Sequence, residues 1–189
     1  MSTTELDTYL LTNWLDLDAA ASRGNVIEYA VLDAVADEVR RWAEARQWSG
    51  VFTSETLWLA PPEWTVKAGK RPAADAWFRF AYYGPEEDNF AITSLMGLNQ
   101  DVAGFDFHQD RVAAKLWKQK ATTPQTLDAL PGFSLQSAVL FHPYQLAHAD
   151  VLEAASGGDY SHVAGSITTV LDQLEAAVPT LSALLGDRP

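Results

Sequence analysis

The sequence predicts an α+β domain in which helices at both ends of the chain pack against an antiparallel sheet of about four strands. Three observations predict it. Apolar residues repeat at helical spacing near both ends, residues 51–108 alternate between apolar and polar positions, and the connections between the alternating segments are short. Short connections favour antiparallel strands, because a parallel pair needs a long crossover. We expect residues 1–189 to form a single α+β domain.

Two helices are expected at the N-terminus. The first covers residues 4–17, and its apolar stripe consists of Leu6, Leu10, Trp14 and Leu17. The segment SRGN at 22–25 is expected to end this helical region. A second helix covers residues 26–46. Trp14 and Trp42 both lie in apolar stripes, so we expect both side chains in the core.

The middle of the chain has the composition of strands. We expect strands at 51–59, 76–83, 89–96 and 101–108, with a Pro-Pro corner at 61–62 and a short extended piece at 64–67. In AWFRFAYY, Phe78 and Phe80 fall on one face, whereas Trp77 and Arg79 fall on the other. The polar bend after Tyr83 is expected to join this strand to the next one as a hairpin.

The last third of the chain is expected to be mostly helical. We expect helices at 110–120, 143–156 and 160–185, and a strand at 133–141. Pro143 suits the first turn of its helix, and Pro179 is expected to kink or divide the last helix. Because only a Gly-Gly-containing turn separates the last two helices, they are expected to form an antiparallel helical hairpin.

The charge of the chain disfavours several kinds of partner. The net charge is −12, with −6 in residues 1–60, zero in 61–120 and −6 in 121–189. This negative field disfavours nucleic acids and anionic membranes and attracts basic protein surfaces.

The absence of cysteine excludes thiol catalysis and disulfides. The N-terminus lacks a signal-peptide pattern and no apolar run could span a bilayer, so we expect a cytoplasmic protein.

The sequence carries no phosphate-binding loop, no dinucleotide fingerprint, no HExxH and no GxSxG motif. We therefore expect no cofactor, and an enzyme is the less favoured interpretation. The alternative that remains open is a metal-dependent hydrolase that uses His142, His148 and Asp150, the densest group of candidate ligands. His148 and Asp150 are two positions apart, so on a helix their side chains would point in different directions.

The favoured interpretation is a non-catalytic acidic protein that binds and inhibits a protein partner, such as an immunity protein or a phage-type inhibitor of an antiviral defence system. The predicted contact residues are the acids of the expected hairpin tip, two N-terminal acids and two tryptophans beside the Pro-Pro corner: Glu86, Glu87, Asp88, Asp16, Asp18, Trp58 and Trp64. A second alternative is a structural subunit of a larger assembly. One form of this alternative is a homodimer that is joined through an open sheet edge or through the C-terminal helices.

Overall fold

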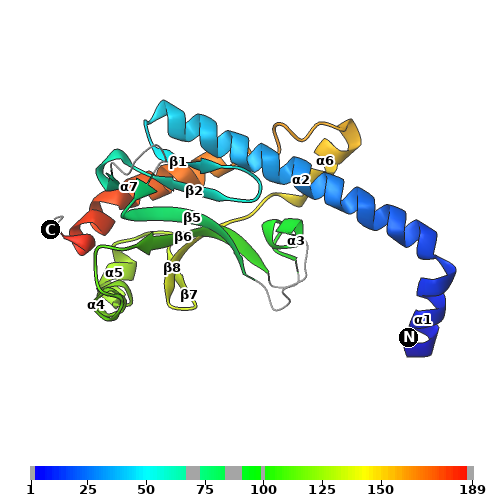
Figure 1. The fold of residues 1–189 in the computed structure, drawn as a ribbon, viewed down its shortest axis with the longest axis horizontal. Coiled ribbons are helices and arrows are strands. Elements are labelled where there is room, and N and C mark those ends of the chain that lie inside the picture. The colour runs from blue at the N-terminus through cyan, green and yellow to red at the C-terminus, as the bar shows by residue number, and fades with distance from the viewer. Residues whose placement is uncertain (1–2, 67–72, 84–90, 99–100, 187–189) are drawn as a thin grey trace.

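The computed structural model in Figure 1 has one main sheet, with the long helix α2 and the C-terminal helix α7 packed together beside it. It describes residues 3–66, 73–83, 91–98 and 101–186. The α+β prediction is confirmed, with an antiparallel sheet, N-terminal helices and a C-terminal helix. The main sheet has six strands rather than about four.

The described helices are α1 (Thr3–Thr12), α2 (Trp14–Ala45), α3 (Ala91–Leu95), α4 (Ala114–Ala121), α5 (Pro124–Asp128), α6 (His148–Gly157) and α7 (Ile167–Leu185), with a short 3₁₀ turn η1 (Pro62–Trp64). The strands of the main sheet, in spatial order, are β1 (Ser49–Phe52), β2 (Leu57–Ala60), β5 (Ala76–Tyr83), β6 (Val102–Gln109), β8 (Val139–Tyr144) and β7 (Ser134–Gln136). All neighbours in this sheet are antiparallel. A separate two-stranded ribbon joins β3 (Thr65–Val66) and β4 (Ala73–Ala74).

Aromatic rings fill the inner face of the sheet. Phe78 in β5 is fully buried, and its ring centroid lies between 5.4 and 6.4 Å from those of Trp48, Trp64, Phe107 and Phe133. Phe80 lies two residues along the same strand and packs against Phe105 of β6 at 4.9 Å. The two-residue period of the strands therefore places one continuous aromatic layer toward the helices.

Polar contacts fix the end of α2 against α7. The indole nitrogen of Trp42 donates to Asp172 Oδ1 at 2.8 Å. The Arg46 guanidinium pairs with Asp172 at 2.9 Å and with Glu175 at 3.1 Å, and it lies 4.3 Å from the centre of the Trp42 ring. Trp42 is 5% exposed, so its predicted core position is confirmed. These contacts set the position of both helices along the sheet.

The predicted break at 22–25 is wrong, because α2 runs without interruption from Trp14 to Ala45. The segment contains one glycine and no proline. A glycine inside a helix costs only about 1 kcal/mol relative to alanine, which the favourable residues on either side can offset. The helix boundary falls instead at Asn13, between α1 and α2.

Two predicted strands prove to be hairpins. Residues 51–59 contain a turn at 53–56, where Thr53 and Thr56 hydrogen-bond each other through backbone and side chain. Residues 133–141 form β7 and β8, joined at Ser137 and Ala138 with φ of 51° and 67°. A two-residue turn of positive φ normally carries asparagine or glycine. Serine and alanine at these positions therefore do not indicate a turn.

The predicted strand at 89–96 is also wrong: residues Ala91–Leu95 form helix α3. The backbone N–H of Ala91 donates to the Glu28 carboxylate of α2 at 2.6 Å, so a distant residue satisfies the free first turn of this short helix. The Leu95 side chain is fully buried, and its carbonyl accepts from the Leu146 N–H at 2.7 Å. Strand β5 pairs instead with β2 and β6, and the predicted hairpin of 76–83 with 89–96 does not form.

The C-terminal boundaries also differ from the prediction. Pro143 lies in strand β8, and the following helix begins only at His148. Residues 158–166 separate α6 from α7 in place of a tight turn, and α7 packs against α2 and β8. Pro179 lies inside α7, which continues through it to Leu185.

Both edge strands of the main sheet are short. Strand β1 has four residues and β7 has three. At β1, Arg40 of helix α2 donates from Nη2 to the Phe52 carbonyl at 2.6 Å, so part of this edge is already hydrogen-bonded. Short, partly occupied edges are typical of sheets that do not add further strands.

We predict that Phe78→Ala lowers the free energy of unfolding by about 3–5 kcal/mol, because it leaves a cavity among four aromatic rings. Urea denaturation measures the change. Leu152→Ala is the control: its side chain is 56% exposed, and the expected change is below about 0.5 kcal/mol. Equal effects of the two substitutions would contradict the aromatic core.

Candidate functional site

An N-terminal arm, defined here as residues 3–26, leads away from the sheet (Figure 1). No residue of α1 is buried, and the buried residues of α2 begin at Val31. The arm exposes large apolar side chains: Leu6, Tyr9, Leu11, Trp14, Leu15 and Val26. Trp14 is 61% exposed, so its predicted core position is wrong. Its helical spacing is correct, but no described element covers it.

The charge of the arm is predominantly negative. Between residues 3 and 26 the sequence has four carboxylates, Glu5, Asp7, Asp16 and Asp18, against a single base, Arg23. The predicted contact residues Asp16 and Asp18 are both exposed here, among the apolar side chains. The arm therefore combines exposed apolar side chains with a negative field, which suits a partner that is both apolar and basic.

The outer face of the sheet, opposite the aromatic core, carries a second group of polar and aromatic residues. The register pairs Trp58 with Arg79, Arg79 with Asp106, and Asp106 with Phe141 across four strands. Trp77 pairs with His108 on the same face, and their rings stack at 5.6 Å. Arg79 is exposed over 53% of its side chain, so this face meets solvent.

Asp106 lies at the centre of the outer face, and we call Arg79, Tyr83, Asp106 and His108 the Asp106 cluster. The side chain of Asp106 is fully buried. Tyr83 Oη donates to its two carboxylate oxygens at 2.7 and 2.8 Å, and Arg79 Nη2 donates at 3.0 Å. His108 Nε2 lies 3.5 Å from Oδ2. The rings of Tyr83 and Phe141 also pack in a T-shaped pair, with their centroids 5.4 Å apart.

The electrostatics of the Asp106 cluster favour a positioning role over catalysis. Burial alone would raise the pKa of Asp106, but the nearby His108 imidazole and the hydrogen bonds from Tyr83 and Arg79 outweigh burial and lower it. Burial and the Asp106 carboxylate raise the pKa of Tyr83 to about 12. Near neutral pH the carboxylate is thus charged and the phenol is protonated, so neither is tuned for proton transfer. The cluster instead holds the exposed Arg79 in place.

Sequence reasoning did not identify the Asp106 cluster. The only signal was the alternation of Arg79 and Tyr83 in one strand and of Asp106 and His108 in another. These four residues converge only when β5 and β6 pair in the observed register. If residues 89–96 are taken as the next strand, residues 76–83 pair with them and not with β6. Arg79 and Tyr83 then stay apart from Asp106 and His108.

The predicted contact residues that the structure describes lie in different parts of the molecule. Glu86, Glu87 and Asp88 lie outside the described residues. Trp58 is half-buried on the outer face of the sheet, where it lines a pocket. Trp64 is fully buried, and its indole donates to Ser182 Oγ of α7 at 2.8 Å. Trp64 therefore belongs to the core and is not accessible to a partner in this structure.

The residues of the hydrolase alternative do not converge. His142 is 3% exposed on the inner face of β8, where its Nδ1 contacts the Pro143 carbonyl at 3.1 Å. Burial lowers the pKa of His142, which keeps it neutral. His148 and Asp150 are exposed at the start of α6. In the described part of the chain, no group of three or more His, Cys, Asp or Glu side chains could hold a metal ion.

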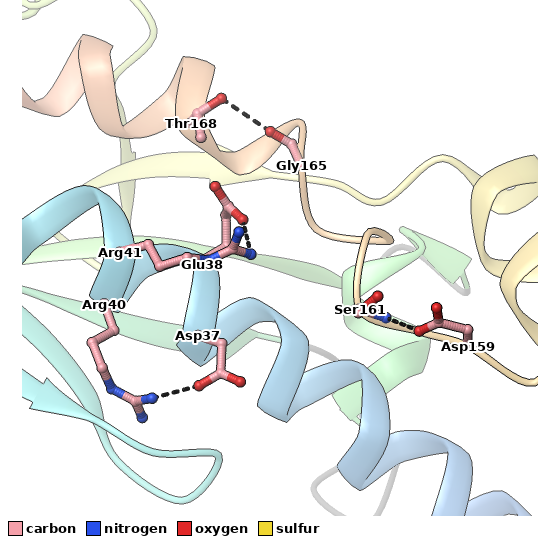
Figure 2. A network of polar contacts seen from close by, with 8 residues as sticks. All are labelled: Asp37, Glu38, Arg40, Arg41, Asp159, Ser161, Gly165 and Thr168. Atoms are coloured by element: carbon pink, nitrogen blue, oxygen red, sulfur yellow. Dashed lines mark hydrogen bonds and ion pairs between the residues drawn. The ribbon is translucent and has the colours of Figure 1, made fainter.

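Arg40 and Arg41 of α2 are already paired, as Figure 2 shows. Arg40 pairs with Asp37, whereas Arg41 pairs with Glu38. A pocket of about 370 Å³ lies beside these residues and His162. Because each arginine already has a carboxylate partner, this pocket has no unpaired guanidinium to attract an anion.

Among the described residues, no helix has the combination of length and apolar character that crossing a bilayer requires. Comparison of the chain with protein-family models, curated proteins and solved structures finds no match. The assignment of function therefore depends on the arm and the outer face alone.

We predict that Asp106→Asn lowers the free energy of unfolding at pH 7 by about 1–3 kcal/mol, because it removes the charge that the hydrogen bonds from Tyr83 and Arg79 stabilise. The folded pKa of Asp106 is below its unfolded value, so its contribution is present above that unfolded value. The contribution is lost as the pH falls through the folded pKa. The difference between wild type and variant should accordingly shrink below about pH 4. Denaturation of both proteins at several pH values measures this difference, and Asp33→Asn at an exposed position is the control. A difference that does not change with pH would contradict the lowered pKa of Asp106.

We also predict that backbone amides of the arm exchange with solvent far faster than those of residues 31–43. A ten-residue helix such as α1 is marginal in water without tertiary packing, whereas residues 31–43 contact the core. Hydrogen exchange followed by mass spectrometry measures both segments in one experiment. Equal protection would show that the arm is covered in solution, for example by a second copy of the chain.

Proposed function

We propose that this protein is a non-catalytic binding protein for a protein partner with a basic surface. The observation that carries the proposal is the arm, where large apolar side chains are exposed next to Asp16 and Asp18. Exposed apolar side chains on a marginally stable helix are unfavourable in water, and their burial becomes favourable when a partner covers them. The net charge of −12 supports a basic partner.

Charge also favours a different protein over a second copy of this chain. Two arms packed together would bring eight carboxylates, four from each chain, close to only two arginines. Like charges placed in one interface destabilise it, whereas a basic partner turns the same charges into an attraction. The proposed partner therefore presents an apolar groove with lysine or arginine at its rim.

Inhibition is the consequence that we propose for such binding. A partner whose basic surface is its working surface, as in a nuclease, loses access to its substrate when an acidic protein covers that surface. The protein would then act as an immunity-type inhibitor, or as a phage-type inhibitor of a defence system. Electrostatic attraction would make its capture of the target fast.

Two double variants of the arm test the proposal, after a partner has been captured from the native host and purified. Leu11→Ser with Leu15→Ser should weaken the affinity at least about tenfold, because both side chains are exposed and their loss affects only the interface. Asp16→Lys with Asp18→Lys should mainly slow association, and high salt should slow the wild type in the same way. Surface plasmon resonance measures both rates.

The matched control is Asp128→Lys with Glu153→Lys, which changes the charge equally at exposed positions outside the arm. It should leave the affinity much closer to that of wild type. Binding that survives both arm variants would reject the arm as the contact. A stable homodimer by light scattering, with no stoichiometric partner, would favour the structural-subunit alternative.

A further inference from the structure

A pocket of about 310 Å³ opens on the outer face of the sheet. Its lining consists of Trp58, Ala73, Ala74, Trp77 and Asp110. The two indoles come from neighbouring strands: Trp58 lies opposite Arg79, and Trp77 is two residues before Arg79 on the same face. The two alanines are the residues of β4, and their small side chains leave the space beside the indoles open.

The charges around this pocket leave one carboxylate unpaired. Asp110 is exposed, and its carboxylate makes no hydrogen bond or ion pair within the described residues. Two cations near the pocket in the described part of the chain are already paired: Arg79 with Asp106 at 3.0 Å, and Arg111 with Asp75 at 2.7 Å. The pocket thus presents two aromatic rings and a free negative charge, the combination that attracts an organic cation.

We propose that this pocket binds an arginine side chain of the partner. The inference rests on the proposed function, because the occupant belongs to the basic protein that the arm is proposed to bind. A guanidinium is planar and weakly hydrated, so it can stack on an indole while it donates hydrogen bonds to a carboxylate. An anion would be repelled by Asp110, and a neutral apolar side chain would leave that carboxylate without a partner.

The experiment uses the full chain, labelled with ¹⁵N, and a blocked Gly-Arg-Gly peptide as the probe. The seven tryptophans give resolvable indole N–H signals, and Trp58→Phe and Trp77→Phe assign the two that line the pocket. We expect the peptide to shift these two signals saturably, with a dissociation constant in the millimolar range, since a single side chain provides little binding energy. The other indole signals should stay in place.

Matched probes and variants then separate charge from shape. The same peptide with citrulline in place of arginine keeps the shape and loses the charge, and it should bind roughly three- to tenfold more weakly. Asp110→Asn should weaken arginine binding by a similar factor, whereas Asp33→Asn on α2 should not change it. Equal binding of the two peptides, or no effect of Asp110→Asn, would overturn the proposal. Tighter binding of tetramethylammonium than of the arginine peptide would overturn the assignment to a partner side chain.

The peptide titration and the capture of a partner have independent outcomes. A captured partner with no indole shift by the arginine peptide would reject the pocket and leave the proposed function intact. Arginine binding by a chain that has no partner would reject the proposed function and with it the origin of the arginine. When both succeed, Asp110→Asn should also weaken binding of the partner.

Discussion

The side chain of Phe78 is fully buried, and it contacts aromatic rings from four other parts of the chain. Trp48 follows helix α2, Trp64 ends the 3₁₀ turn, Phe107 lies in β6 and Phe133 precedes β7. The packing of this one ring therefore joins the helical layer to the centre of the sheet. Because large planar rings fit together in few arrangements, it also fixes the register of β5 against β6.

The outer face of the sheet follows from that constraint. Successive side chains of a strand point to opposite faces, so Phe78 and Phe80 in the core place Trp77 and Arg79 outside. The same register brings Asp106 beneath Arg79, where the buried carboxylate orders the guanidinium above it. Tryptophan, tyrosine and arginine are the residues that most often dominate the energy of protein interfaces. A core built from aromatic rings thus also produces a surface suited to recognition.

Sequence reasoning predicted the elements whose period is long and unbroken. Strand β5 was predicted within its observed bounds, since the alternation of Phe78 and Phe80 persists over eight residues. Helix α3 could not be predicted, because five residues carry little periodicity and its first turn depends on Glu28 from another helix. Trp14 is helical, as its spacing predicted, but a period shows which side chains can share a face and not what covers that face. The Asp106 cluster needed the strand register, which short-range patterns do not specify.

The contact between Arg40 and the Phe52 carbonyl has a consequence for assembly. A sheet polymerises when an unoccupied edge accepts a strand from a neighbouring molecule, as in amyloid or donor-strand exchange. Here one edge strand has four residues and gives a carbonyl to an arginine, and the other has only three residues. A molecule with an apolar arm could otherwise aggregate at high concentration. Its sheet, however, offers a poor template for growth, so the arm can remain uncovered without seeding fibres.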